Sequence, residues 1–157
     1  MAVNVSDRVR AHVQGDFVVF IIGLRINRPW RVTSYLRPML AMRSMLDELQ
    51  QIGPDSGLLH VERVGFLTFI QYWRSFDHLE SYARDSTRKH RPAWTAFNLQ
   101  MKRRSGDVGL FHETYLVQGG KYEAVYRGMP PTGLAVAGEQ ALVNDAADSA
   151  RQRIYLD

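Results

Sequence analysis

The sequence predicts an α+β domain with elements in the order β-α-β-β-α-β, a ferredoxin-like sandwich that pairs with a second copy into a dimeric α+β barrel. Strand-like and helix-like patterns alternate in this order between residues 15 and 137, as in ferredoxin-like domains. The first strand, within residues 16–26, is apolar on both faces. Such a strand must be covered on both sides. Helices cover one face, and we expect a twin sheet on the other, because a large exposed apolar face favours aggregation.

The first helix is predicted after residue 30, where apolar residues recur with helical spacing up to Leu49. Pro38 lies inside this pattern, so the helix either kinks there or begins anew with Pro38 in its first turn. The sequence Gly53-Pro54-Asp55 ends it. Two short strands follow at residues 58–64 and 66–73.

Ser75 is a good N-cap for the second helix, and Asp77 is favourable in its first turn. A further helical piece is predicted from Pro92 to about Arg104. The fourth strand is predicted at residues 108–117, with a possible fifth at 122–126.

Outside the domain at 15–137, we expect an N-terminal arm at 1–14 and a polar C-terminal tail at 138–157. The arm lacks the apolar core of a signal peptide. The longest apolar run has eight residues, 17–24, whereas a bilayer span needs roughly 20. We therefore expect a soluble, cytoplasmic protein without a membrane partner. The absence of cysteine excludes disulfides, thiolate metal sites and cysteine nucleophiles, and agrees with a reducing compartment.

The charge pattern argues against nucleic acid as a partner. The net charge is +4, and no segment interleaves a basic stripe with aromatic residues. The sequence also lacks the G-x-G-x-x-G, P-loop, H-E-x-x-H and G-x-S-x-G motifs. Nucleotide binding, phosphoryl transfer, zinc proteolysis and serine hydrolysis therefore have no support.

One candidate site lies on the predicted helical piece near residue 97. His90, Trp94, Phe97 and Met101 are spaced four, three and four apart, so they share one helical face. This face is apolar apart from the histidine and is expected to look toward the sheet. His90 is then either a core histidine satisfied by backbone carbonyls or a ligand of a haem iron, which needs an apolar slot.

A second histidine lies in the fourth predicted strand. Alternation puts His112 and Thr114 on one face and Phe111, Glu113 and Tyr115 on the other. A histidine within an apolar strand is unfavourable unless it has partners. His112 is therefore either a general acid/base, for which imidazole is suited near neutral pH, or a structurally paired side chain.

Three further residues could contribute. Arg25 in the first strand requires an anionic partner, which could be Glu62 or Glu113, a haem propionate or a substrate group. Trp73 is expected in the aromatic core and, if haem is bound, among the residues around it. His60 is expected at the surface or at an interface.

The residues Tyr72-Trp73-Arg74-Ser75-Phe76 and His90-Arg91-Pro92-Ala93-Trp94 resemble the antibiotic-biosynthesis-monooxygenase clan of dimeric α+β barrels. Within it, the chain is most similar to the branch grouped with a fumagillin-pathway monooxygenase. The residues Gly23 to Trp30 and Gly128 to Leu134 also fit that branch. The resemblance covers roughly residues 8–137.

A more distant resemblance concerns haem-containing aldoxime dehydratases. His90 with Phe97, followed by Leu110-Phe111-His112-Glu113, is similar to the C-terminal half of those enzymes. The resemblance implies that His90 is the proximal haem ligand and His112 the distal acid/base that helps to dehydrate an aldoxime to a nitrile. Arg25 is a candidate for the family's distal arginine, whereas its distal serine has no clear counterpart. That family fuses two ferredoxin-like halves in one chain, so this shorter chain is expected to form a homodimer.

Three functions follow as hypotheses. The first is a haem-binding enzyme acting on a small apolar substrate, with His90 on iron and His112 on the substrate side. The second is a cofactor-independent monooxygenase of secondary metabolism, in which Tyr72, Trp73 and the two histidines orient the substrate. The third is a non-enzymatic dimeric ligand-binding domain. In each subunit, the functional space is expected between the second helix and the sheet, with the dimer interface on the opposite face.

Overall fold

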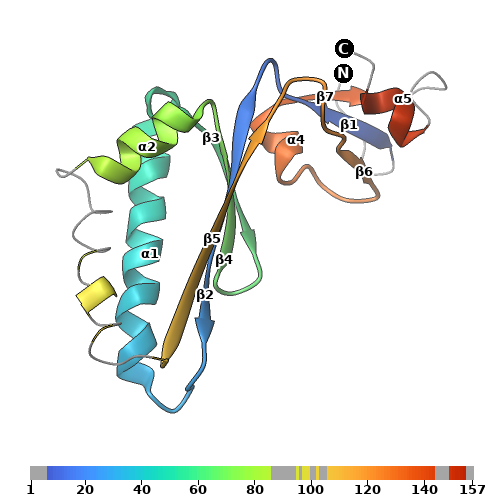
Figure 1. The fold of residues 1–157 in the computed structure, drawn as a ribbon. Coiled ribbons are helices and arrows are strands. Elements are labelled where there is room, and N and C mark those ends of the chain that lie inside the picture. The colour runs from blue at the N-terminus through green and yellow to red at the C-terminus, as the bar shows by residue number, and fades with distance from the viewer. Residues whose placement is uncertain are drawn as a thin grey trace.

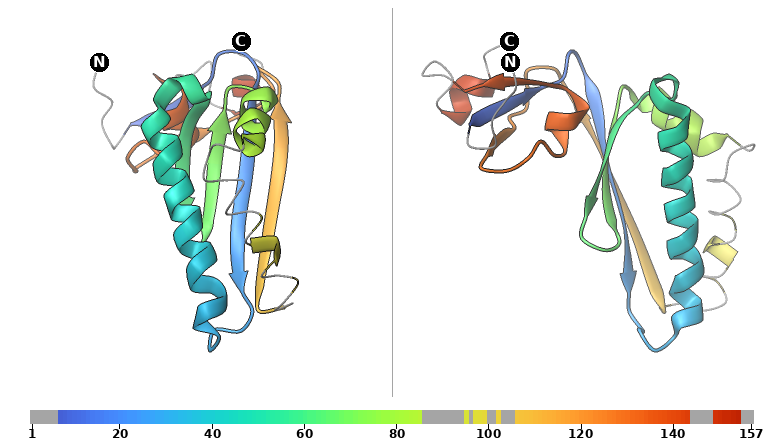
Figure 2. Two further views of the ribbon diagram at one scale, coloured as in Figure 1. Left: turned by 90° about the vertical axis from the view of Figure 1, so that its left-hand side faces the viewer. Right: turned by 180° about the vertical axis from the view of Figure 1, so that it is seen from behind.

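The computed structural model describes residues 7–85, 95, 97–99, 102, 106–143 and 149–154. Its main sheet is antiparallel and has the strand order β3-β4-β2-β5 (Figure 1). The strands are β2 (Phe17–Ile26), β3 (Leu58–Val64), β4 (Thr68–Trp73) and β5 (Val108–Val117). The helices α1 (Val32–Ile52) and α2 (Phe76–Arg84) intervene in the chain, and both lie on one face of the sheet (Figure 2). The predicted α+β, ferredoxin-like fold is confirmed.

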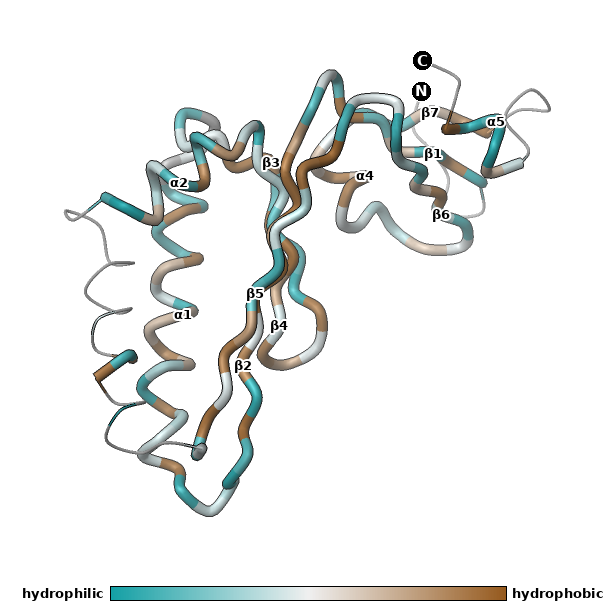
Figure 3. The backbone as a smooth tube through the Cα atoms, viewed as in Figure 1, coloured by the Kyte–Doolittle hydropathy of each residue, from teal (hydrophilic) through white to brown (hydrophobic). Residues whose placement is uncertain are grey.

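Helix α1 is a single continuous helix that contains Pro38. Hydrophobic and hydrophilic bands alternate along it (Figure 3), and its buried residues Met42, Leu46 and Leu49 face the sheet. The helix ends at Gly53, whose φ of 69° favours glycine, and a short 3₁₀ turn, η1 (Gly53–Ser56), leads into β3.

A buried carboxylate connects the start of α1 to the start of β5. Asp107 is 1% exposed and accepts hydrogen bonds from Ser34 Oγ at 2.8 Å and Arg28 Nη1 at 2.9 Å. The Ser34 hydroxyl and then the charges of Arg28 and Arg31 lower the pKa of Asp107. The backbone carbonyl of Asp107 also accepts from the N–H groups of Asn27 and Arg28. These bonds hold the β2–α1 loop beside β5 and so fix where α1 begins.

Helix α2 begins as predicted. The side chain of Ser75 accepts a hydrogen bond from the backbone N–H of His78, and Asp77 lies in the first turn. Leu79 and Tyr82 are its buried residues. Of the helical piece predicted between residues 92 and 104, the described residues 95, 97–99 and 102 are helical.

A second antiparallel sheet has the order β6-β1-β7. It consists of β1 (Arg8–His12), β6 (Val125–Arg127) and β7 (Glu139–Leu142), accompanied by α4 (Leu134–Ala137) and α5 (Ala150–Ile154). From the sequence, 1–14 is expected to be an arm and 138–157 a tail, but in the structure part of each forms a strand here. The reason is visible in β1, where the alternating residues Val9 and Ala11 are buried.

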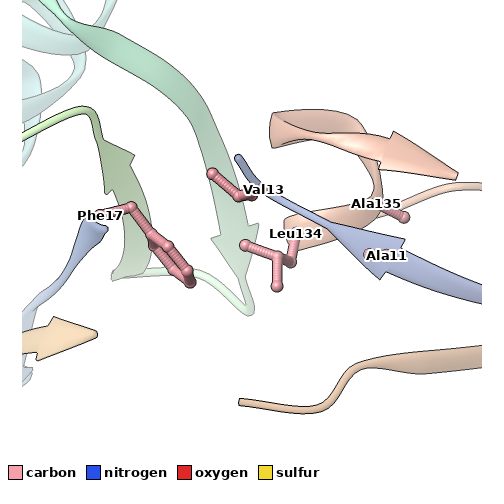
Figure 4. Close-up of a cluster of buried hydrophobic side chains, with 5 residues drawn as sticks. All are labelled: Ala11, Val13, Phe17, Leu134 and Ala135. Atoms are coloured by element: carbon pink, nitrogen blue, oxygen red, sulfur yellow. The ribbon is translucent and has the colours of Figure 1, made fainter. Parts of the chain in front are cut away.

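A hydrophobic cluster packs the second sheet against the main one. Its buried members are Ala11, Val13, Phe17, Leu134 and Ala135 (Figure 4). The ring of Phe17 meets that of Tyr122 edge-on at 4.9 Å. The chain therefore covers one end of the open sheet face by itself, and a twin is not needed there. Farther along this face, Phe111 and Tyr115 remain 43% and 50% exposed.

None of the helices in the described residues is long and apolar enough to cross a bilayer. The cytoplasmic location expected from the sequence stays a prediction.

The Phe17 contact gives a stability test. Replacing the buried ring by Phe17→Ala leaves a cavity between the two sheets, so we expect the free energy of unfolding to fall by about 3–5 kcal/mol, measured by urea denaturation. Leu116→Ala, at a residue 72% exposed on β5, is the control and should change stability by less than about 0.5 kcal/mol. Equal effects of both variants would show that the cluster does not hold the sheets together.

Candidate functional site

A cavity of about 470 Å³ lies between the helices and the sheet. Its floor is formed by strand residues and its walls by the two helices and Phe97. The apolar lining comprises Phe20, Ile22, Leu24, Leu110, Pro38, Ala41, Met42, Met45, Leu46, Leu49, Phe76, Leu79, Tyr82, Ala83 and Phe97. The cavity lies where the sequence predicts the functional space.

Strand alternation decides which polar side chains reach this cavity. Phe20 pairs with Gln71 on one side and with Thr114 on the other, and the next helix-facing residue, Ile22, pairs with His112. The floor therefore carries Gln71 on β4, and His112 and Thr114 on β5. The His112 and Phe20 rings lie 5.7 Å apart and are tilted by 35°.

The cavity rim carries one ion pair. Arg84 Nη2 lies 2.8 Å from Glu80 Oε1, one helical turn away on α2, and both residues belong to the lining. Arg84 is the only cation among the described lining residues.

The structure brings together only some of the predicted site residues. His112 and Phe97 line the cavity, whereas His90, Trp94 and Met101 lie outside the described residues. Trp73 is 0% exposed and packs in the core with Val18 and Tyr82, adjacent to the cavity wall rather than in it. The roles assigned to these residues stay predictions.

Arg25 lies away from the cavity. It is exposed and alternates along β2 with the cavity residues Ile22 and Leu24, so it projects from the opposite face. In the described part of the chain it forms no ion pair with Glu62 or Glu113. Two further polar residues of the lining, Gln71 and Arg84, were not predicted from the sequence. The signal for Gln71 was a single amide in an otherwise apolar strand, whereas Arg84 had only its i,i+4 spacing from Glu80.

The opposite face carries a separate polar cluster around Glu62. One carboxylate oxygen of Glu62 accepts from Thr132 Oγ1 at 2.6 Å and from the Gly133 N–H at 2.8 Å, and lies 3.3 Å from His60 Nε2. These bonds, with Thr132 contributing most, lower the pKa of Glu62. Gly133 has a φ of 56°, and a Cβ there would lie 3.0 Å from the Tyr72 hydroxyl.

The cluster is a structural connection between β3 and α4, because its bonds join the sheet to the segment before Leu134. His60 stacks on Tyr72 with ring centroids 6.3 Å apart. Burial, with Tyr126 and Glu62 nearby, raises the pKa of Tyr72 to about 12. Tyr72 is thus a neutral hydroxyl on the face away from His112, and the two residues do not share a site in this chain.

The fold and the cavity define a class: a ferredoxin-like α+β domain with a partly open, mainly apolar cavity on its helical face. The chain belongs to the Monooxygenase af470-like family, whose model matches residues 17–134. The family resemblance predicted from the sequence is thereby confirmed.

Individual proteins that are similar to this chain include a curated relative and a solved structure. Monooxygenase af470 of Aspergillus fumigatus is 27% identical over 128 residues, which cover 75% of this chain and 45% of that protein. The crystal structure of the aldoxime dehydratase OxdRE in complex with butyraldoxime superposes with a TM-score of 0.61 at 16% identity, over 96% of this chain and 43% of that one. The second likeness shows the fold alone. The chain spans less than half the length of either protein.

The Glu62 cluster predicts a pH dependence of stability. The folded-state pKa of Glu62 lies below its ordinary value of 4.5, so the carboxylate bonds contribute fully above that pH and are lost as the pH falls through the folded-state pKa. We expect Glu62→Gln to lower stability at pH 7 and to reduce the loss of stability on acidification, measured by urea denaturation between pH 7 and 3. Thr132→Val, which removes one donor, should give an intermediate slope. Parallel profiles for wild type and Glu62→Gln would contradict the assignment.

Proposed function

We propose that this protein is an enzyme whose active site is the cavity between α1, α2 and the sheet, and that it acts on a small, mainly apolar substrate. The cavity itself carries the proposal. Its volume of about 470 Å³ is within the range of small-molecule sites, which are mostly apolar with a few polar groups. Membership of the Monooxygenase af470-like family favours oxidation as the reaction.

His112 is the proposed acid/base of this site. It is the only titratable side chain on the described part of the cavity floor, and no hydrogen bond to a described residue occupies its ring nitrogens. An imidazole can accept or donate a proton near neutral pH. Thr114, two residues farther along the same strand face, can orient a substrate or a water beside it.

Haem is the proposed cofactor, and the described residues fit it in part. Phe97 is in the cavity wall, and His90 precedes it by seven residues, the spacing of about two helical turns. His90 would ligate the iron, with Trp94, Phe97 and Met101 around the ring. Arg84, which lines the cavity, would pair with a propionate in place of Arg25, which projects from the opposite face of the sheet. A bound haem would supply redox or Lewis-acid chemistry. His112 would donate a proton to the substrate or accept one from it.

A cofactor-independent monooxygenase is the second candidate, favoured by the sequence relative named a monooxygenase. In that case the whole cavity would hold the substrate. Of the residues expected to orient it, His112 lines the cavity, whereas Tyr72 lies on the other sheet face. A non-enzymatic binding domain would use the same cavity without proton transfer.

An absorption spectrum with added haem tests the cofactor. We expect the wild type and the control His60→Ala, whose histidine lies outside the cavity, to shift and sharpen the Soret band of the added haem. His90→Ala should leave the band as it is for free haem, because the iron would lose its protein ligand. A band shift in His90→Ala equal to that of the wild type would remove His90 from that role.

Turnover assays with the wild type and His112→Ala distinguish the three functions. With butyraldoxime, or with dioxygen, an added reductant and an apolar substrate, His112→Ala should keep haem binding and lose most turnover, since a positioned acid/base contributes about 10²–10⁴-fold. Turnover by haem-free protein would support the cofactor-independent reaction instead. Ligand binding without any turnover that depends on His112 would support the binding domain.

We also propose that two copies pair through the uncovered part of the open sheet face. Phe111 and Tyr115 are exposed there, on β5, which is a long edge strand. This chain matches 43% of the solved aldoxime dehydratase. Two copies of this chain would therefore be similar in length to that one enzyme. Arg25 lies on this face and could meet a carboxylate of the second copy.

Sedimentation velocity tests the pairing. The wild type should sediment with twice the chain mass of 18.0 kDa. Phe111→Asp should shift it to the monomer, because the charge would be buried at the interface. The control Leu116→Asp alters a neighbouring residue of β5 whose side chain faces the other side of the sheet, and should leave the mass unchanged. A monomeric wild type, or a dimer that survives Phe111→Asp, would contradict this interface.

A further inference from the structure

We infer that Gln71 selects the ligand of the cavity: its amide N–H groups donate a hydrogen bond to an acceptor such as a carbonyl, and Trp73 positions that amide. This inference rests on the proposed function, because it concerns the same cavity. It adds a chemical requirement that size and apolarity alone do not impose.

The orientation of the amide follows from a single hydrogen bond. Trp73 Nε1 donates to Gln71 Oε1 at 3.0 Å. An indole N–H can only donate, so the amide oxygen must face the tryptophan and the NH₂ group must face elsewhere. Trp73 is completely buried and packed on all sides, so it holds the amide in this orientation.

The NH₂ group opens into the cavity. Gln71 is only 6% exposed and lines the cavity. Among the described residues, every side-chain nitrogen or oxygen that is sealed from solvent has a partner. The amide nitrogen of Gln71 has none in that part of the chain, so it must reach accessible space. A buried amide donor aimed into an apolar cavity is unfavourable unless a ligand or water accepts from it.

The register places this donor relative to His112. Gln71 and Thr114 flank Phe20 on either side, so their backbones are about 10 Å apart across two strand spacings. His112 lies on the Thr114 side, one residue pair along the strand. A ligand whose acceptor binds Gln71 would therefore lie over Phe20 and present its other end to His112. The favoured ligands are small apolar ketones, esters or amides; a group that can only donate, such as an ammonium, is disfavoured.

A pair of probes of nearly equal shape tests the inference. 2-Acetylnaphthalene carries a carbonyl where 2-isopropenylnaphthalene carries a methylene, and both dissociation constants can be measured by fluorescence titration. The measured quantity is the ratio of Kd for the alkene to Kd for the ketone. We expect Gln71→Met, which keeps the side-chain shape, to lower this ratio about tenfold, the factor that one hydrogen bond of this kind supplies. Thr68→Val, a control on the same strand as Gln71 whose side chain faces the other side of the sheet, should change it less than twofold.

Two further variants keep the test decisive if Gln71→Met is unstable. Gln71→Glu still accepts from Trp73 but offers the ligand no amide donor, so it should also lose the preference for the ketone. Trp73→Phe frees the amide to turn, and should lower the ratio while leaving the alkene Kd within about twofold; a purely structural role would weaken both probes alike. An unchanged ratio in the Gln71 variants, with the alkene still bound, would overturn the inference. Failure of the wild type to bind either probe would instead contradict the proposed apolar site, and the inference with it.

Discussion

The rest of the structure depends on strand β2, a central strand that is apolar on both faces. Its side chains Phe20, Ile22 and Leu24 face the helices, and Phe17, Val19 and Ile21 face the other way. Both sets must leave water, which is why the chain builds a layer on each side. The helical layer leaves room for a ligand above the first set. The second sheet closes over Phe17 and Val19, and the part it does not reach is the face proposed to bind a second copy.

The two faces of the main sheet also carry polar side chains of different kinds. On the helical side, an apolar cavity carries three polar side chains on its floor, and one of them, Gln71, is fixed from beneath by Trp73. On the other side, the polar cluster around Glu62 is bonded within the protein: Glu62 accepts hydrogen bonds from Thr132 and Gly133. Polar groups that lack protein partners are the ones available to a ligand. This contrast is the physical reason for locating the proposed site on the helical face.

Much of this arrangement could be predicted from local sequence patterns. The two-faced apolar pattern of β2, the N-cap at Ser75 and the alternation around His112 each depend on neighbouring residues, and they gave the fold, the second helix and the cavity side of β5. The second sheet could not be predicted in this way, because β1 and β7 pair across more than a hundred residues and each is too short to stand out. From the sequence, Gln71 could be recognised only as an amide in a strand, and Trp73 only as a core aromatic residue. Their joint role depends on a hydrogen bond that no spacing rule implies. Arg25 was assigned by residue type, and only the register shows that it points away from the cavity.

The most direct test of the central claim, that ligands bind between the helices and the sheet, uses the methionines as reporters. Met42 and Met45 of α1 line the cavity, whereas Met39 and Met129 do not. With ¹³C-methyl methionine labelling, titration with 2-acetylnaphthalene should shift the methyl resonances of Met42 and Met45 through the ring current of the bound probe, and leave those of Met39 and Met129 in place. Saturable shifts at Met129 with none at Met42 and Met45 would contradict the account.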